Sequence, residues 1–212
     1  PFFNGRSCAS CHRDGGRGAL PEALNFVAAD PVYGKFLQTR AVQGLRAEAQ
    51  VKISVEDQIT ALADGTEVVL HAPIYQPADL HYGALRNPLS ARIAPALTGL
   101  HLLEQVSADY VQSLADPDDS NGDGISGRIS KVPELASGAL VTGRFGWKAE
   151  SYSLQMQVAK ALSLDMGLGN SLFPSAFGDC TEHQPDCLQM ASGNSPATSD
   201  PEISDTVLGL LL

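Results

Sequence analysis

The sequence predicts a mainly α-helical fold, enlarged by one β-hairpin and by long loops. Apolar residues recur at helical spacing over 100–115 and again over 153–165, a pattern typical of helices that bury one face. Apolar and polar residues instead alternate within 49–72, on both sides of the turn signal Asp64-Gly65, which predicts the hairpin. Prolines interrupt residues 73–95, so this stretch is expected to be a loop without regular structure.

Two helices carry signals for their ends. Asp30-Pro31 can start a helix and Gly44 can end it, so we expect a short helix between them. The pattern over 100–115 is expected to break near Ser107, whose hydroxyl can cap a second helix.

Charge and composition narrow the classes of partner. The 212 residues include 43% hydrophobic residues, which is ordinary for a globular protein, and carry a formal net charge of −10. Nucleic acids and anionic membrane surfaces require a basic face, so the net charge argues against both as partners. No run of about 20 apolar residues exists, so no membrane span is expected. A small neutral oxidant or a basic redox partner fits better.

The segment Cys8-Ala9-Ser10-Cys11-His12 is the most specific motif. Two thiols three residues apart can each form a thioether to a haem vinyl group, while the next residue presents imidazole to the iron. A redox dithiol does not need this histidine, and a structural zinc site needs two further nearby ligands. The glycine-rich turn Gly15–Gly18 lets the backbone pass close to a porphyrin edge. We therefore expect covalent haem c, with His12 as iron ligand, in a cytochrome c-like haem domain.

A second cysteine pair, Cys180 and Cys187, closes a short polar loop. A disulfide is the simplest interpretation, and a second metal site is the alternative. Haem thioethers and a disulfide both indicate an oxidising compartment, so we expect a periplasmic or secreted protein. The sequence shows no export signal at its start and ends within an apolar run that resembles an interrupted helix, so we expect a fragment.

Residues 116–130 contain a candidate calcium loop. Oxygen ligands would come from alternating side chains and one carbonyl, namely Asp119, Asn121, Asp123 and Ile125. The twelfth position of the loop is Ser130, where the full motif has a bidentate Glu, so the match is incomplete. A solvated acidic turn is the alternative, although a cation would relieve repulsion among the carboxylates.

Several segments together resemble the di-haem oxidoreductase family, also called thiol oxidoreductase, within the bacterial di-haem cytochrome c peroxidase superfamily. They occur in order over residues 1 to about 175. The matching segments are Ser7–His12 with Gly15–Gly18, Arg92–Leu97, Asn121–Arg128, Gly143–Ala149, and Leu154–Gln157 with Asp165-Met166.

The resemblance implies an enzyme that reduces hydrogen peroxide with electrons relayed from a second haem. Trp147 corresponds to a tryptophan that lies between two haems, displaced by one residue. Gln157 and Asp165 stand where the superfamily has a Gln and a Glu on the side where peroxide binds. A base there can accept a proton from peroxide and return it to the leaving oxygen, while an amide orients the peroxide.

The sequence signals for other haem-binding residues are weaker. The superfamily often has an open sixth iron position or a loop histidine there, and His81 is the candidate, with His71 as second choice. Arg92 is a further candidate for haem binding. If a methionine (Met156, Met166 or Met190) closed the sixth position, the protein would be an electron carrier without catalysis. A calcium-stabilised binding module with a structural haem is a third possibility.

The resemblance also implies two haems, whereas the sequence contains one attachment motif. We expect a haem domain over 1–190, and over 191–212 a linker and the start of a helix that leads to a second haem domain or, alternatively, a mono-haem protein. The electron donor is then either this second domain or a separate protein.

Overall fold

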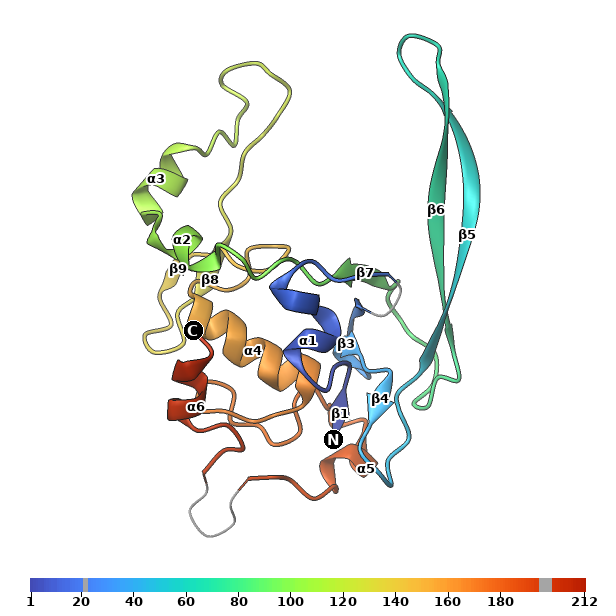
Figure 1. Ribbon diagram of the computed structural model, residues 1–212, viewed down its shortest axis with the longest axis vertical. Helices are drawn as coiled ribbons and strands as arrows, with labels where there is room; N and C mark the ends of the chain where they lie inside the picture. Colours follow the sequence, from blue (N-terminus) through green and yellow to red (C-terminus); the bar gives the residue numbers. More distant parts are fainter. Residues whose placement is uncertain (21–22, 195–199) are drawn as a thin grey trace.

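The computed structural model describes residues 1–20, 23–194 and 200–212 (Figure 1). The expectation of a mainly helical, cytochrome c-like fold is wrong. Only 20% of the structure is helical, in short helices, and 27% is strand in several small antiparallel sheets. Within the described residues, no helix is long and apolar enough to cross a membrane.

A three-stranded antiparallel sheet forms one half of the interior. Its strands are β2 (Leu24–Asp30), β3 (Gly34–Leu37) and β7 (Ser90–Ile93), in the order β3-β2-β7. Alternate residues of β2 and the end of β3 turn toward one hydrophobic core, which consists of Phe26, Ala28, Tyr33, Leu37 and Ala49. In this strand order, β3 is an edge strand.

The helix expected between Asp30 and Gly44 does not form. The Asp30 carboxylate accepts hydrogen bonds from the amides of Val32 and Tyr33, which makes a tight turn, and Gly34 follows with a φ of +76°. A left-handed residue at this point ends any right-handed helix. The chain continues instead as β3 and then as β4 (Arg40–Ala41), which pairs with β1 (Phe2–Phe3).

The helical expectations in the second half are confirmed. The first pattern forms α2 (Leu100–Gln105) and α3 (Ala108–Ser113), separated at Ser107, whose hydroxyl accepts from the amide of Tyr110. The second forms α4 (Leu154–Met166), which starts at the cap Ser153 and packs against α6 (Asp205–Leu210). The remaining short elements are the helical turn α1 (Cys8–Cys11), the 3₁₀ turn η1 (Arg13–Gly15), β8 (Lys131–Pro133), β9 (Leu140–Thr142) and α5 (Pro185–Leu188).

The strands β5 (Gln50–Ala61) and β6 (Glu67–Ala78) form a long hairpin that stands away from the rest of the molecule (Figure 1). The second strand runs six residues beyond the expected end at 72 and includes Pro73 and Pro77. In a two-stranded ribbon, half of the amides point outward, so prolines at those positions remove no ladder hydrogen bond. The expectation of an irregular loop over 73–95 is therefore wrong for 73–78, and also for 90–93, which form β7.

Candidate functional site

His12 is held from outside its own turn. Its ring Nδ1 lies 2.7 Å from the carbonyl oxygen of Pro95, and because a carbonyl can only accept, Nδ1 carries the proton. In the neutral ring, the other nitrogen, Nε2, then keeps its lone pair. A histidine oriented in this way by a backbone carbonyl is prepared to bind a metal through Nε2.

The two thiols of the motif lie on one helical turn, α1 (Cys8–Cys11). Ser7 caps this turn, because its hydroxyl accepts from the amide of Ser10 at 3.2 Å. Both cysteines are free, with Cys8 exposed and Cys11 half-buried. Burial raises the pKa of Cys11, and the negative charge of Asp165 adds to this effect. Because neither sulfur is in a disulfide, both thiols of this turn are free for covalent attachment of a group.

Three consecutive carbonyls at the end of β7 connect this turn to the tryptophan. The oxygen of Ile93 accepts from the indole Nε1 of Trp147 at 2.6 Å, that of Ala94 from the amide of Gly18 at 2.9 Å, and that of Pro95 from His12. The segment 93–95 therefore joins the indole and the imidazole through a short hydrogen-bonded path.

Gly18 is required for this arrangement. A Cβ at this position would lie 2.4 Å from the Cβ of Ala23 and 2.8 Å from the carbonyl oxygen of Cys11. The turn after the motif therefore packs directly against the start of β2, where any side chain would push the two apart.

Basic side chains surround Trp147. The indole is 52% exposed, and the guanidinium of Arg17 lies 5.9 Å from its ring centre. An open hollow of about 340 Å³ beside it is lined by Arg92 and Lys148, together with Ala91 and Ile93. In a chain with a net charge of −10, this local excess of positive charge favours an anionic group such as a carboxylate.

Asp165 lies at the C-terminal end of α4. Its carboxylate accepts a hydrogen bond from the side-chain amide of Asn25 at 2.8 Å. Burial raises the pKa of Asp165 to about 7, and the negative charge of Asp179 adds to this effect, while Lys160 and Lys35 oppose it. The carboxyl group can therefore both accept and donate a proton near neutral pH. Asn25 had no signal in the sequence.

The structure also shows the neighbours of the other predicted site residues. Gln157 is two turns before Asp165 on α4, and its Oε1 lies beside Gly146, next to Trp147. His81 contacts the ring of Tyr82, and its Nε2 is 3.4 Å from Asp186 on α5. His71 lies on the projecting hairpin, 2.6 Å from Asp57. These two histidines thus have carboxylate partners of their own.

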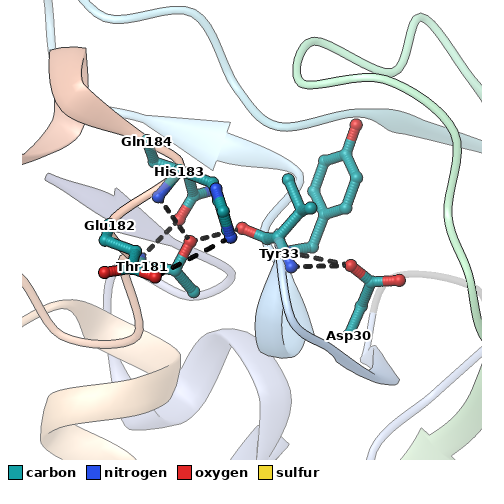
Figure 2. Close-up of polar contacts among 7 residues, drawn as sticks. Asp30, Tyr33, Thr181, Glu182, His183 and Gln184 are labelled. Carbon is teal, nitrogen blue, oxygen red and sulfur yellow. Dashed lines mark hydrogen bonds and ion pairs between the residues drawn. The ribbon is translucent and has the colours of Figure 1, made fainter.

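The disulfide Cys180–Cys187 is present, which confirms the expected pairing. Figure 2 shows part of the loop that it closes, where Thr181 lies against the turn at Asp30–Tyr33 and Gln184 bonds back to Thr181. The Thr181 hydroxyl donates to the carbonyl of Val32 at 2.6 Å, and the Gln184 amide oxygen accepts from the amide of Thr181 at 2.9 Å. The bridge thus fixes a loop that packs against the main sheet.

The acidic loop is organised by its own backbone. Asp119 accepts from the amides of Asp123 and Gly124, and Asp123 accepts from the amide of Ile125 at 2.8 Å. Within residues 1–20, 23–194 and 200–212, three or more His, Cys, Asp or Glu side chains nowhere gather closely enough to hold a metal ion. Calcium binding by Asp119, Asn121, Asp123 and Ile125 stays a prediction.

The donor set around α1 fits a haem. Two free thiols on one turn and an imidazole with its Nδ1 proton already engaged are the groups that covalent haem attachment uses.

Comparisons with known proteins agree with this assignment. The sequence model of the family described as "Di-haem oxidoreductase, putative peroxidase" matches residues 33–188, a range that begins after the Cys8–His12 motif. Neither the curated proteins nor the solved structures contain a match to this chain. With a match over most of its length, the chain belongs to the di-haem oxidoreductase family.

Proposed function

We propose that this chain is the peroxidase-like haem half of a di-haem enzyme that reduces hydrogen peroxide in the periplasm or another exported location. Cys8 and Cys11 would attach haem c covalently, and His12 would bind its iron through Nε2. The hydrogen bond from His12 Nδ1 to Pro95 carries this proposal, because it selects the tautomer that a metal ligand needs. The disulfide supports the exported location.

The haem, when bound, supplies an iron that binds peroxide and passes it the electrons that break the O–O bond. The chain's own residues manage protons and electron entry. Asp165 accepts a proton from one peroxide oxygen and delivers it to the other as water leaves. A pKa of about 7 suits this exchange, because both protonation states are populated at neutral pH. Gln157 orients the peroxide through its side-chain amide.

Trp147 and Arg92 serve the electron path and the haem edge. The hydrogen-bonded path from the indole through Ile93 to Pro95 gives electrons from a second haem a connected route to His12. The positive charges of Arg92 and Lys148 beside Trp147 suit the carboxylates at a haem edge. His81 would take the sixth iron position, although its present partner is Asp186.

The attachment is tested by haem staining after denaturing electrophoresis of the exported full-length protein. In the wild-type chain this domain should carry covalently bound haem after denaturation. In a variant with both Cys8→Ser and Cys11→Ser, this domain should carry none. A variant with both Cys180→Ser and Cys187→Ser is the matched control, because it also loses two cysteines but should keep the stain. Haem retained in this domain by the first variant would overturn the covalent assignment.

The catalytic assignment is tested with Asp165→Asn in the full-length enzyme. This change keeps the shape and the hydrogen bond to Asn25 but removes the base, so peroxide reduction should slow by the ~10²–10⁴-fold that acid–base catalysis contributes. Haem content, measured by absorption, should stay unchanged. If the variant reacted with peroxide at the wild-type rate, the protein would instead be an electron carrier without this catalytic function.

A further inference from the structure

Trp147 lies in a short closed loop, Phe145–Ser151. The amide of Phe145 donates to the carbonyl of Ser151 at 2.9 Å, and the amide of Ser151 donates to the carbonyl of Phe145 at 3.2 Å, so the two ends of the loop are bonded to each other. Both ends are buried, whereas the indole between them is half-exposed. The loop is therefore fixed at its neck, and other contacts must set the position of the indole.

Part of this loop is held in a conformation that it would not adopt freely. Ala149 has a φ of +48°, a left-handed conformation that costs free energy for any residue other than glycine. Its carbonyl oxygen lies against Gly143, where a Cβ would be only 2.0 Å away. A backbone in such a conformation persists only where its surroundings hold it in place. The loop therefore requires an anchor close to Ala149.

Glu150 supplies this anchor. Its Oε2 accepts from Lys35 Nζ on β3 and from Lys160 Nζ on α4, the latter at 3.1 Å. The Lys160 side chain is only 17% exposed, so its ammonium group needs a counter-charge, and without Glu150 it would face Lys35 and be repelled. One carboxylate thus joins the loop to the main sheet and to the helix that carries Gln157 and Asp165.

The indole contact lies three residues before this anchor. Trp147 Nε1 donates to the carbonyl of Ile93 at 2.6 Å. Between the indole and the neck, Gly146 packs close to α4, since a Cβ there would lie 3.3 Å from Gln157 Oε1. If the ion pairs of Glu150 were lost, this side of the loop could move away from α4, and the indole could move away from Ile93.

We propose that Glu150 is a positioning residue for electron delivery: its ion pairs hold the loop so that the Trp147 indole keeps its hydrogen bond to Ile93. The inference rests on the proposed function, in which electrons from a second haem pass through Trp147. Glu150 itself transfers neither electrons nor protons. Its loss should therefore slow the arrival of electrons and leave the first reaction with peroxide, in which Asp165 acts, unchanged.

This role is tested by stopped-flow absorption of the full-length, haem-loaded enzyme. Glu150→Gln keeps the shape but removes the charge, so re-reduction should slow about tenfold while the first reaction with peroxide keeps its rate. Glu150→Asp retains the charge and should restore part of the lost rate. Glu56→Gln, which changes an exposed carboxyl on β5, is the matched control and should react like the wild type.

A double variant separates positioning from a general loss of structure. Glu150→Gln added to Trp147→Phe should slow re-reduction no further, because the contact that Glu150 maintains is already gone. Additive slowing would overturn the proposal. So would a slower first reaction in Glu150→Gln, since Lys35 and Lys160 also act on the charge of Asp165.

Two outcomes distinguish this inference from the proposed function. Wild-type re-reduction in Glu150→Gln, combined with slow re-reduction in Trp147→Phe, overturns the positioning role but leaves the electron path intact. Wild-type re-reduction in Trp147→Phe overturns the electron path itself, and the role of Glu150 with it.

A measurement without turnover reports on the indole directly. Ultraviolet resonance Raman spectra are sensitive to hydrogen bonding of an indole N–H, and subtracting the spectrum of the matching Trp147→Phe protein isolates the signal of Trp147. Glu150→Gln should shift this signal toward a weaker hydrogen bond, and Glu56→Gln should not. If Glu150→Gln does not fold, Lys35→Gln removes one partner of the same carboxylate and should give a shift in the same direction. An unchanged signal in the folded variant overturns the proposal.

Discussion

The imidazole Nδ1 of His12 lies 2.7 Å from the carbonyl oxygen of Pro95, although 83 residues separate them in the sequence. This contact ties the Cys-x-x-Cys-His turn to the segment that follows β7. Two residues earlier, the carbonyl of Ile93 accepts from Trp147. One short segment therefore sets both the orientation of the ligand and the position of the tryptophan.

Replacing Trp147 by Phe should separate electron delivery from peroxide chemistry. The ring volume is largely kept, but the indole N–H bond to Ile93 and the more easily oxidised ring are lost. Stopped-flow absorption of the full-length enzyme should show an unchanged first reaction with peroxide and a slower re-reduction. Asp165→Asn should give the reverse pattern, so equal effects of both variants on the first reaction would contradict these separate roles.

The disulfide should stabilise the folded state measurably. The cysteines are seven residues apart, and closing so short a loop contributes about 2–3 kcal/mol to the free energy of unfolding. A variant with both Cys180→Ser and Cys187→Ser should lose this amount in chemical denaturation. Thiol labelling of the unreduced, unfolded wild-type chain provides the check, since modification of both residues would show that the bridge is absent in solution.

Glu48, which is 1% exposed, should make stability fall as pH rises. Burial raises its folded pKa to about 8, above the ordinary value of 4.5, so the folded state holds a proton that the unfolded state releases between these pH values. The stabilisation is complete below about pH 4.5 and is lost as the pH approaches 8. The difference is on the order of 3 kcal/mol.

Thermal unfolding between about pH 5 and pH 8 measures this effect. The wild-type melting temperature should decrease across the range, and Glu48→Gln should flatten the curve, because its amide cannot ionise. Glu56→Gln is the control for general charge effects. Parallel curves for wild type and Glu48→Gln would show that Glu48 ionises normally in the folded state.

Calcium binding by the loop over 116–130 is best tested by removing the metal. If Asp119, Asn121 and Asp123 bind calcium, a chelator should lower the melting temperature and added calcium should restore it. Asp119→Asn should abolish this response, since a ligand charge is lost. An unchanged melting temperature in chelator would favour a turn stabilised only by its backbone hydrogen bonds.

Local signals predicted the second half of the chain better than the first. Ser107 and Ser153 cap helices where their neighbours have helical periodicity, so sequence and structure agree there. Between Asp30 and Gly44, the left-handed conformation of Gly34 prevents a helix, and the chain continues as a strand. Gly34 packs against Asp179, which is far away in the sequence. A contact between residues so far apart in the sequence leaves no periodic pattern near Gly34. The expectation of a helix between Asp30 and Gly44 therefore met no contrary signal.

The site was predicted where chemistry is encoded in adjacent residues. Cys8, Cys11 and His12 form a motif that can be read directly, whereas Pro95 contributes a backbone carbonyl that any residue could supply. Glu150 was missed because a single Glu in a polar stretch resembles a surface residue, and its position follows from Lys35 and Lys160. Partners that act through the backbone or through long-range ion pairs require the folded chain.

The two prolines of β6 have a consequence for how this protein behaves at high concentration. A two-stranded ribbon exposes two open edges, and such edges can pair with other molecules and extend into aggregates. Pro73 and Pro77 lie opposite Val55 and Val51, where the absent N–H groups would have pointed outward. An incoming strand would find no donors at these positions. The prolines therefore protect the long ribbon against edge-to-edge self-association.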